Sequence, residues 1–122
     1  MMPGNDYIFA LNLSDLEIGT QRAVNLRGRN VLLCRTEGGV YALADLCPHA
    51  QQPLAGSPIE GKAIRCRLHG ARFNILTGIP LNSVTRKSVA VFPVRIREGV
   101  IEVNVPPVAT GYLPQFAIQS GK

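Results

Sequence analysis

Short runs of alternating apolar and polar residues recur along the chain, and turn-forming residues separate them. Alternation with a period of two is typical of strands that bury one face, and many short strands at this spacing predict an antiparallel sandwich or barrel. We expect strands at residues 7–13, 22–26, 31–35, 40–43, 62–65, 72–75, 89–97 and 100–105. The predicted fold class is therefore all-β.

Turn motifs lie between several of these strands. The segments 27–30, 37–39 and 98–99 contain glycine next to polar residues and predict tight hairpin turns. Ser14 and Glu17 match a capping box, which predicts one helical turn between the first two strands. The sequence shows no long helical periodicity, so we expect strands to form the core.

The chain has 122 residues, which suffices for one domain but leaves no room for a separate catalytic domain. We expect a single domain over 1–122 with a proline-containing tail at 106–122. The first residues lack a basic region followed by an apolar run, and no run of about eighteen apolar residues occurs. The sequence therefore predicts a soluble, cytoplasmic protein without a membrane anchor, and we expect a monomer.

The charge balance is basic, with 13 Lys and Arg residues against 8 Asp and Glu residues and a formal net charge of +5. The basic residues are scattered and are not interleaved with aromatic residues, as they would be on a surface that stacks nucleic-acid bases. Net charge alone supplies only non-specific attraction to nucleic acid. We therefore expect no nucleic-acid partner.

Two cysteine–histidine pairs carry the candidate chemistry. Cys47 and His49 are separated by one residue, Cys66 and His69 by two, and sixteen residues lie between the pairs. Two thiolates and two imidazoles complete the coordination of a [2Fe–2S] cluster in which one iron has two Cys ligands and the other two His ligands. The pattern predicts two loops that enclose such a cluster from opposite sides.

Other uses of these residues have to be weighed. Structural zinc sites usually combine two close pairs of like ligands, which differs from the present Cys-x-His and Cys-x₂-His spacing. A free cysteine is often a small buried hydrophobe, and we interpret Cys34, in the apolar run 31–34, in this way. A disulfide between Cys47 and Cys66 would leave both histidines unexplained.

The residues around the second pair resemble a known family. Residues 66–74 read CRLHGARFN and are followed by Thr77 and Gly78, while the first loop ends in Pro53 and Leu54. This pattern is similar to the Rieske-type ferredoxins that serve bacterial ring-hydroxylating oxygenases. The resemblance extends from about residue 7 to 105. It implies a Rieske-type antiparallel fold in which residues 45–75 form a small cluster-binding subdomain of two loops.

The resemblance implies an electron carrier rather than an enzyme. Such ferredoxins pass one electron from a flavin-containing ferredoxin reductase to the terminal oxygenase of an aromatic-ring-hydroxylating dioxygenase system. It also implies that each histidine binds iron through one ring nitrogen, so that His49 and His69 form the electron exit. The alternatives are a small Rieske-like subunit of a nitrite reductase or related complex, whose members can lack the ligands present here, and a zinc-stabilised binding module.

Several residues are expected to shape the surroundings of the cluster. Gly70 allows the backbone to bend sharply after the second histidine. Leu54 and Leu68 are expected to form an apolar cover, because the hydrophobic shell sets the local dielectric. By the resemblance, Ala71 and Phe73 stand where high-potential relatives carry hydroxyl groups. We therefore expect a reduction potential toward the lower end of the range of about −150 to +300 mV.

Two further expectations concern the rim of the site. A third loop that covers the cluster usually contains prolines in such ferredoxins, whereas residues 82–84 read Asn-Ser-Val, which predicts a cover without that source of rigidity. Electrostatic complementarity speeds the encounter of protein partners. Four basic residues near the second loop are predicted to form a docking patch: Lys62, Arg65, Arg67 and Arg72.

Overall fold

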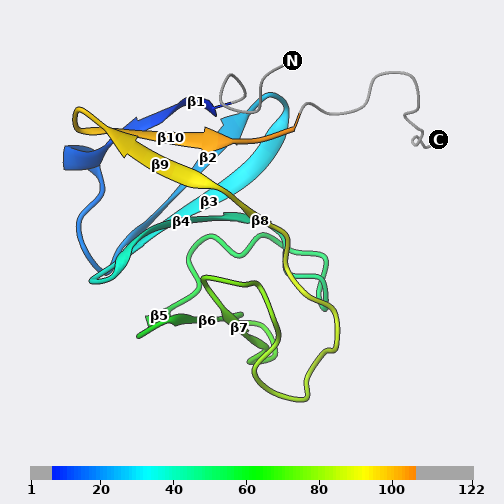
Figure 1. Cartoon of the computed structure of the whole chain (residues 1–122). Coiled ribbons are helices and arrows are strands. Elements are labelled where there is room, and N and C mark those ends of the chain that lie inside the picture. The colour runs from blue at the N-terminus through cyan, green and yellow to red at the C-terminus, as the bar shows by residue number, and fades with distance from the viewer. Residues whose placement is uncertain (1–6, 107–122) are drawn as a thin grey trace, which may run out of the picture.

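The computed structural model describes residues 7–106, which form three antiparallel sheets (Figure 1). The first sheet has the strand order β1-β10-β9, the second β2-β3-β4-β8 and the third β5-β6-β7. The strands are β1 (Tyr7–Asn12), β2 (Gln21–Leu26), β3 (Arg29–Thr36), β4 (Gly39–Ala44), β5 (Ile59–Glu60), β6 (Ala63–Arg65), β7 (Arg72–Asn74), β8 (Val91–Phe92), β9 (Val94–Arg97) and β10 (Val100–Asn104). We call the first two sheets the scaffold. The all-β prediction is confirmed.

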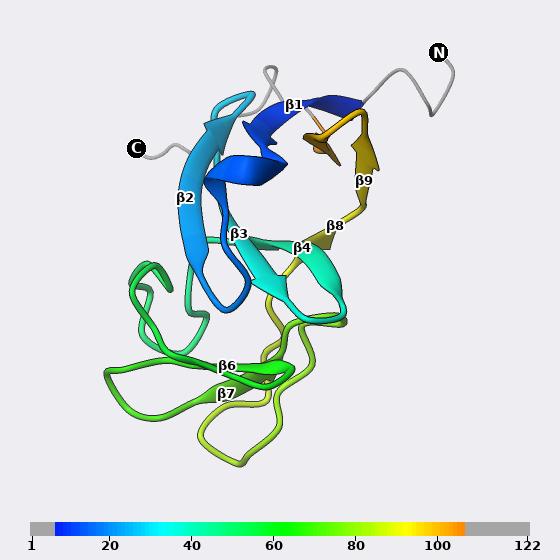
Figure 2. The ribbon, with the colours of Figure 1, turned by 90° about the vertical axis from the view of Figure 1, so that its left-hand side faces the viewer.

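The β3–β4 hairpin lies between the other two sheets (Figure 2), and this position explains the continuous apolar run in β3. Val31 and Leu33 pack into the core between the two scaffold sheets. Leu32 and Cys34 point the other way and pack into a second core, which is shared with the third sheet. Because side chains alternate between the two faces of a strand, a strand buried on both faces needs apolar residues at every position.

Residues 45–75 contain the third sheet and the two predicted ligand loops. Ile64 on β6 is paired with Phe73 on β7, and both side chains are fully buried in the core shared with the scaffold. β5 pairs with the other edge of β6, from Ile59 to Glu60. β5 was not among the predicted strands, because a run of two residues shows no detectable alternation.

The predicted strand at 89–97 is interrupted at Pro93. The preceding pair forms β8 on the edge of the second sheet, and the following residues form β9 in the first sheet. Proline has no N–H to donate to a strand partner, although its carbonyl still accepts a hydrogen bond from Asn104 at 2.9 Å. The chain therefore changes sheets at the residue that cannot continue the pairing.

The predicted hairpin turns at 27–30 and 98–99 are confirmed, and both contain two consecutive residues with positive φ, as type I′ turns require. The predicted helical turn between the first two strands is present, but its predicted capping box is wrong. A 3₁₀ helix, Leu13–Asp15, begins after Asn12 without a side-chain cap, and it ends as Leu16 adopts an extended conformation. Leu16 is fully buried in the scaffold core. Its burial ends the helical turn before Glu17 can complete the predicted cap.

The predicted tail at 106–122 lies outside the described residues except for Pro106, whose carbonyl accepts a hydrogen bond from Arg29 Nε at 2.7 Å. Between residues 7 and 106, no helix has the length and apolar character needed to cross a membrane.

Candidate metal centre

The first loop follows β4 and is closed by backbone hydrogen bonds around Cys47. The Cys47 N–H donates to the carbonyl of Gln52 at 2.7 Å, and the Cys47 carbonyl accepts from the N–H of Gln51 at 2.8 Å. Gln51 has a φ of 57°, in the left-handed region. His49 lies inside this closed turn.

The second loop joins β6 to β7 and repeats the same construction around Cys66. The Cys66 N–H donates to the carbonyl of Ala71 at 2.7 Å, and the Cys66 carbonyl accepts from the N–H of Gly70 at 2.9 Å. Gly70 has a φ of 76°. Each cysteine thus accepts from the fourth residue after it and donates to the fifth, and the fourth residue is left-handed. From the sequence, a sharp bend could be predicted at Gly70 only. A positive φ is expected of glycine and not of glutamine, so Gln51 gave no such indication.

The four candidate ligands are arranged as two pairs of unlike accessibility. Cys47 and Cys66 are fully buried, and both belong to the core that the loops share with the scaffold. His49 and His69 are exposed, with ring centroids 4.8 Å apart and an interplanar angle of 87°. All three cysteines of the chain are free thiols in the structure, so the alternative disulfide is absent.

A single zinc ion and a [2Fe–2S] cluster require different arrangements of these four side chains. In the part of the chain that the structure describes, no three His, Cys, Asp or Glu side chains are gathered as they would be around one ion. A [2Fe–2S] cluster with two thiolates on one iron and two imidazoles on the other requires separate thiol and imidazole pairs on facing loops. The donor set and its arrangement fit such a cluster.

The electrostatic surroundings of the Cys47 sulfur contain opposing influences. Burial raises the pKa of the Cys47 thiol above its ordinary value, and contact with Cys66 acts in the same direction. The backbone N–H groups of Ala50 and His49 donate to the sulfur and lower its pKa. Such donors stabilise the thiolate, which is the form that binds a metal.

Cys34 shares the buried core with the other two thiols but has a different environment. Burial raises the pKa of Cys34 to about 12, with a smaller contribution from the charge of Asp45. A thiol with this pKa stays protonated at neutral pH and is a poor nucleophile. The structure therefore agrees with its interpretation as a buried, inert residue.

The predicted apolar surroundings are only partly buried. Leu54, Ala71 and Phe73 are completely inaccessible and lie in the same core as both loop thiols. Leu68 is 50% exposed. Its exposure follows from its place in the outward-facing stretch 67–69 of the second loop, where each residue is exposed. Leu54 is thus buried beside the thiols, whereas Leu68 lies at the surface.

Polar side chains outside the cysteine–histidine pairs also hold the first loop. Asp45 Oδ1 accepts a hydrogen bond from the N–H of Ala55 at 2.8 Å. The Gln21 side chain, on β2, accepts from the Gly56 N–H and donates to the Ser57 carbonyl. A short acidic residue at the start of a loop is a recognisable turn motif, but Gln21 acts across thirty-five residues of sequence or more. No local pattern could have identified it.

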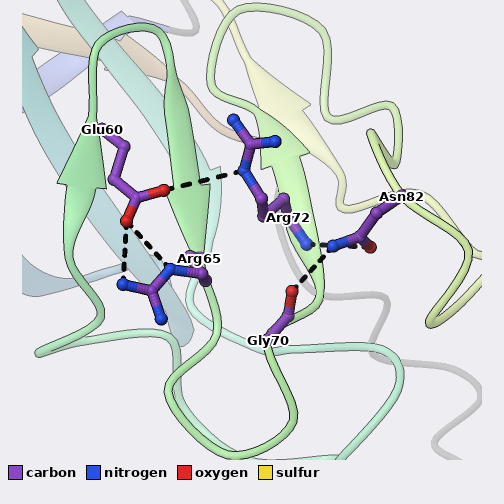
Figure 3. Close-up of polar contacts among 5 residues, drawn as sticks. All are labelled: Glu60, Arg65, Gly70, Arg72 and Asn82. Atoms are coloured by element: carbon purple, nitrogen blue, oxygen red, sulfur yellow. Dashed lines mark hydrogen bonds and ion pairs between the residues drawn. The ribbon is translucent and has the colours of Figure 1, made fainter.

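The four predicted docking cations have different surroundings. Arg65 donates to Glu60 at 2.9 Å, and Arg72 Nε lies 3.6 Å from the same carboxylate (Figure 3). The hydrogen bond from Arg65 lowers the pKa of Glu60, so its compensating charge persists at neutral pH. Lys62 lies in the turn between β5 and β6. Arg67 is exposed between the two ligand residues of the second loop, and its guanidinium lies against Gly56.

A small β-protein with buried paired thiols and exposed paired imidazoles has the construction of an iron–sulfur protein with mixed Cys and His ligation. Residues 6–93 match the family model described as "Rieske [2Fe-2S] domain". The chain belongs to this family, and the predicted resemblance and cofactor are confirmed.

Within this family, the chain is similar to ferredoxins of dioxygenase systems. The ferredoxin component of the naphthalene 1,2-dioxygenase system of Pseudomonas putida is 33% identical over 90 residues, which cover 74% of this chain and 86% of the relative. The ferredoxin of carbazole 1,9a-dioxygenase from Nocardioides aromaticivorans has a similar structure, with a TM-score of 0.77, 28% identity, and coverage of 84% of this chain and 98% of its own. A chain from a complex of oxygenase and ferredoxin in carbazole 1,9a-dioxygenase gives the same TM-score at 30% identity, covering 85% of this chain and 97% of its own.

Proposed function

We propose that Cys47, His49, Cys66 and His69 hold the [2Fe–2S] cluster of the family. The buried thiols are suited to one iron, and the exposed imidazoles to the other. When bound, such a cluster accepts and releases a single electron. The two similarly closed loops around Cys47 and Cys66 hold the ligands with few degrees of freedom, which favours little rearrangement between redox states.

We further propose that the protein is a cytoplasmic one-electron carrier that connects a flavin-containing ferredoxin reductase with the terminal oxygenase of an aromatic-ring-hydroxylating dioxygenase system. The exposure of His49 and His69 carries this proposal, because it brings one side of the site to the surface where a partner can approach. The ferredoxin relatives, one of them from a complex with its oxygenase, support the choice of partners.

Arg67 is the cation best placed to assist docking. It is exposed between the second-loop ligands, whereas Arg65 and Arg72 are paired with Glu60. Exposed charges attract an oppositely charged partner over about 10 Å at 0.1 M ionic strength. An acidic surface on the oxygenase would complement Arg67 and speed association.

Electron transfer to an isolated oxygenase tests the function. We expect the dithionite-reduced protein, freed of excess reductant, to reduce a terminal oxygenase of this class in stopped-flow mixing. The Arg67→Glu variant should react more slowly, with the difference greatest at low salt because salt screens exposed charges. The Lys62→Glu variant changes the charge equally, away from the loops, and serves as the control.

Two outcomes would contradict the proposal. Failure of the reduced, cluster-loaded protein to reduce any oxygenase of the class would exclude the carrier function. A salt-independent slowing in the Arg67→Glu variant would indicate damage to the loop and remove Arg67 from the docking surface.

Ala71 and Phe73, which are buried in the same core as the thiols, can be substituted to test what sets the reduction potential. Ala71→Ser and Phe73→Tyr should each raise the reduction potential by up to about 40 mV, because a new hydroxyl can donate to a cluster sulfur and stabilise the reduced form. This limit converts a net hydrogen bond of about 1 kcal/mol with the one-electron slope of 59 mV per tenfold change. Protein-film voltammetry on both single variants and the double variant measures the shift. An unchanged potential in a double variant with an intact spectrum would show that neither side chain faces the cluster.

A further inference from the structure

The segment after β7 turns back and pairs with this strand. The Asn74 N–H donates to the carbonyl of Ile79 at 2.9 Å, and the Leu81 N–H donates to the carbonyl of Arg72 at 2.7 Å. The returning segment thus lies along β7 as an additional edge. This backbone pairing extends as far as Leu81, the residue before Asn82.

The Asn82 side chain continues the pairing toward the second loop. Its Oδ1 accepts a hydrogen bond from the N–H of Arg72 at 3.3 Å, and its Nδ2 donates to the carbonyl of Gly70 at 2.8 Å (Figure 3). A primary amide offers a donor and an acceptor side by side, as a peptide unit does. Asn82 therefore joins the returning segment to backbone groups on both sides of Ala71.

The Gly70 peptide connects Asn82 to the candidate ligands. The Gly70 N–H closes the loop by donating to the carbonyl of Cys66, while the Gly70 carbonyl accepts from Asn82. His69 lies directly before Gly70 and is exposed. Glycine has the greatest backbone freedom of any residue. An outside hydrogen bond on its carbonyl restricts the part of the loop that can move most easily.

We propose that Asn82 is a positioning residue that holds the loop bearing His69 in its ligand geometry. The inference rests on the proposed ligand set. One side chain of the segment 82–84, which lacks the prolines usual in such ferredoxins, would thus support the loop that bears His69. Without Asn82, the loop should open more often, and bound iron should become accessible to a competing chelator.

The test uses the full-length protein loaded with its cluster. We expect Asn82→Ala to lose the cluster to excess chelator about fivefold faster or more, because one net hydrogen bond corresponds to a factor of about five. Loss is followed by the decay of visible absorbance, and the EPR spectrum of the reduced protein should shift. Asn82→Asp keeps an acceptor for Arg72 but loses the donor to Gly70, so it should also release the cluster faster than the wild type.

Asn25→Ala is the matched control. The Asn25 amide donates to Asn30 Oδ1 at 3.1 Å and accepts from the Gly28 N–H at 3.2 Å, so it also donates one hydrogen bond and accepts one from a backbone N–H, at the β2–β3 turn of the scaffold. We expect this variant to release the cluster at the wild-type rate with an unchanged EPR spectrum. Faster release confined to the Asn82 variants would support the positioning function.

The outcomes that overturn the inference differ from those that overturn the function. Equal acceleration in the Asn25 and Asn82 variants would indicate general destabilisation and exclude a specific function of Asn82. Wild-type release rates in both cluster-loaded Asn82 variants would also overturn the inference, and would leave the proposed ligands intact. A wild-type protein that takes up no cluster would overturn the ligand set and, with it, this inference.

Discussion

Replacing His69 by cysteine is expected to lower the reduction potential by about 125 mV while iron stays bound. Clusters with two His and two Cys ligands have potentials of about −150 to +300 mV, whereas plant-type clusters with four Cys ligands lie near −400 mV. A third thiolate adds negative charge and disfavours the additional electron. One replacement makes half of the change in ligands. From a starting potential near the lower end of the range, half of the gap to the four-Cys clusters is about 125 mV.

Protein-film voltammetry measures this change, with iron content and the visible spectrum recorded on the same samples. Leu68→Cys is the control, because it places a thiol at an exposed neighbouring position of the same loop and leaves the imidazole in place. Its potential should match the wild type. An unchanged potential in a His69→Cys protein that retains iron would remove His69 from the ligand set.

The Gly78→Ala substitution is expected to destabilise the fold by about 2–6 kcal/mol. Gly78 has a φ of 78°, and a Cβ at this position would lie 1.9 Å from the carbonyl oxygen of Val89. Backbone strain of this kind costs about 1–3 kcal/mol, and overpacking against fixed atoms costs a further 1–3 kcal/mol. The clash cannot be relieved by a side-chain rotation, because the obstructing atom belongs to the backbone.

The loss of stability in Gly78→Ala is expected to affect the candidate metal centre because of where Gly78 lies. Gly78 donates to the carbonyl of Asn74 at 2.7 Å, and its own carbonyl accepts from the Val89 N–H at 2.9 Å. These bonds fasten the segment after β7 to the core shared with the loop thiols, since Val89 is buried in that core. A small domain is stable by only about 5–15 kcal/mol, so the substitution removes a large share.

Urea denaturation of the wild-type protein and the Gly78→Ala variant measures the expected destabilisation. Gly61→Ala is a matched control, because Gly61 also has a positive φ, of 66°, but no atom of the described residues lies within 4 Å of its added Cβ. It should show the cost of strain alone, about 1 kcal/mol. Equal stability losses in the two variants would show that the backbone around Val89 yields easily and that close packing at Gly78 is unimportant.

The strands and the ligand pairs could be predicted because each depends on local sequence. Alternation along residues 100–105 reflects the period of a strand, and β10 was found within one residue of its predicted end. The cysteine–histidine spacing could be recognised because each loop closes within five residues of its cysteine. The continuous apolar run in β3 could be read as a strand, but not as one that separates two cores.

Other predictions depended on residues that meet only after folding. Glu60 pairs with Arg65 and Arg72, whereas the predicted docking cation Arg67 is exposed beside His69. Pro93 was visible in the sequence. Which sheet the strand before it joins, and which the strand after it joins, depends on the sheet edges that are available for pairing after folding. Leu68 is exposed although its side chain is apolar, because the loop surrounding it faces outward.

By itself, the sequence determined the all-β class, most strand positions, the two cysteine–histidine loops and the family, because short-range periodicity and spacing specify these features. The tertiary structure decided which ligands are buried and which exposed. It also decided that Gln21 holds the first loop and Asn82 the second. Hydrogen bonds of this kind form between segments that are distant along the chain, and their partners are selected by the packing of the sheets rather than by any local pattern.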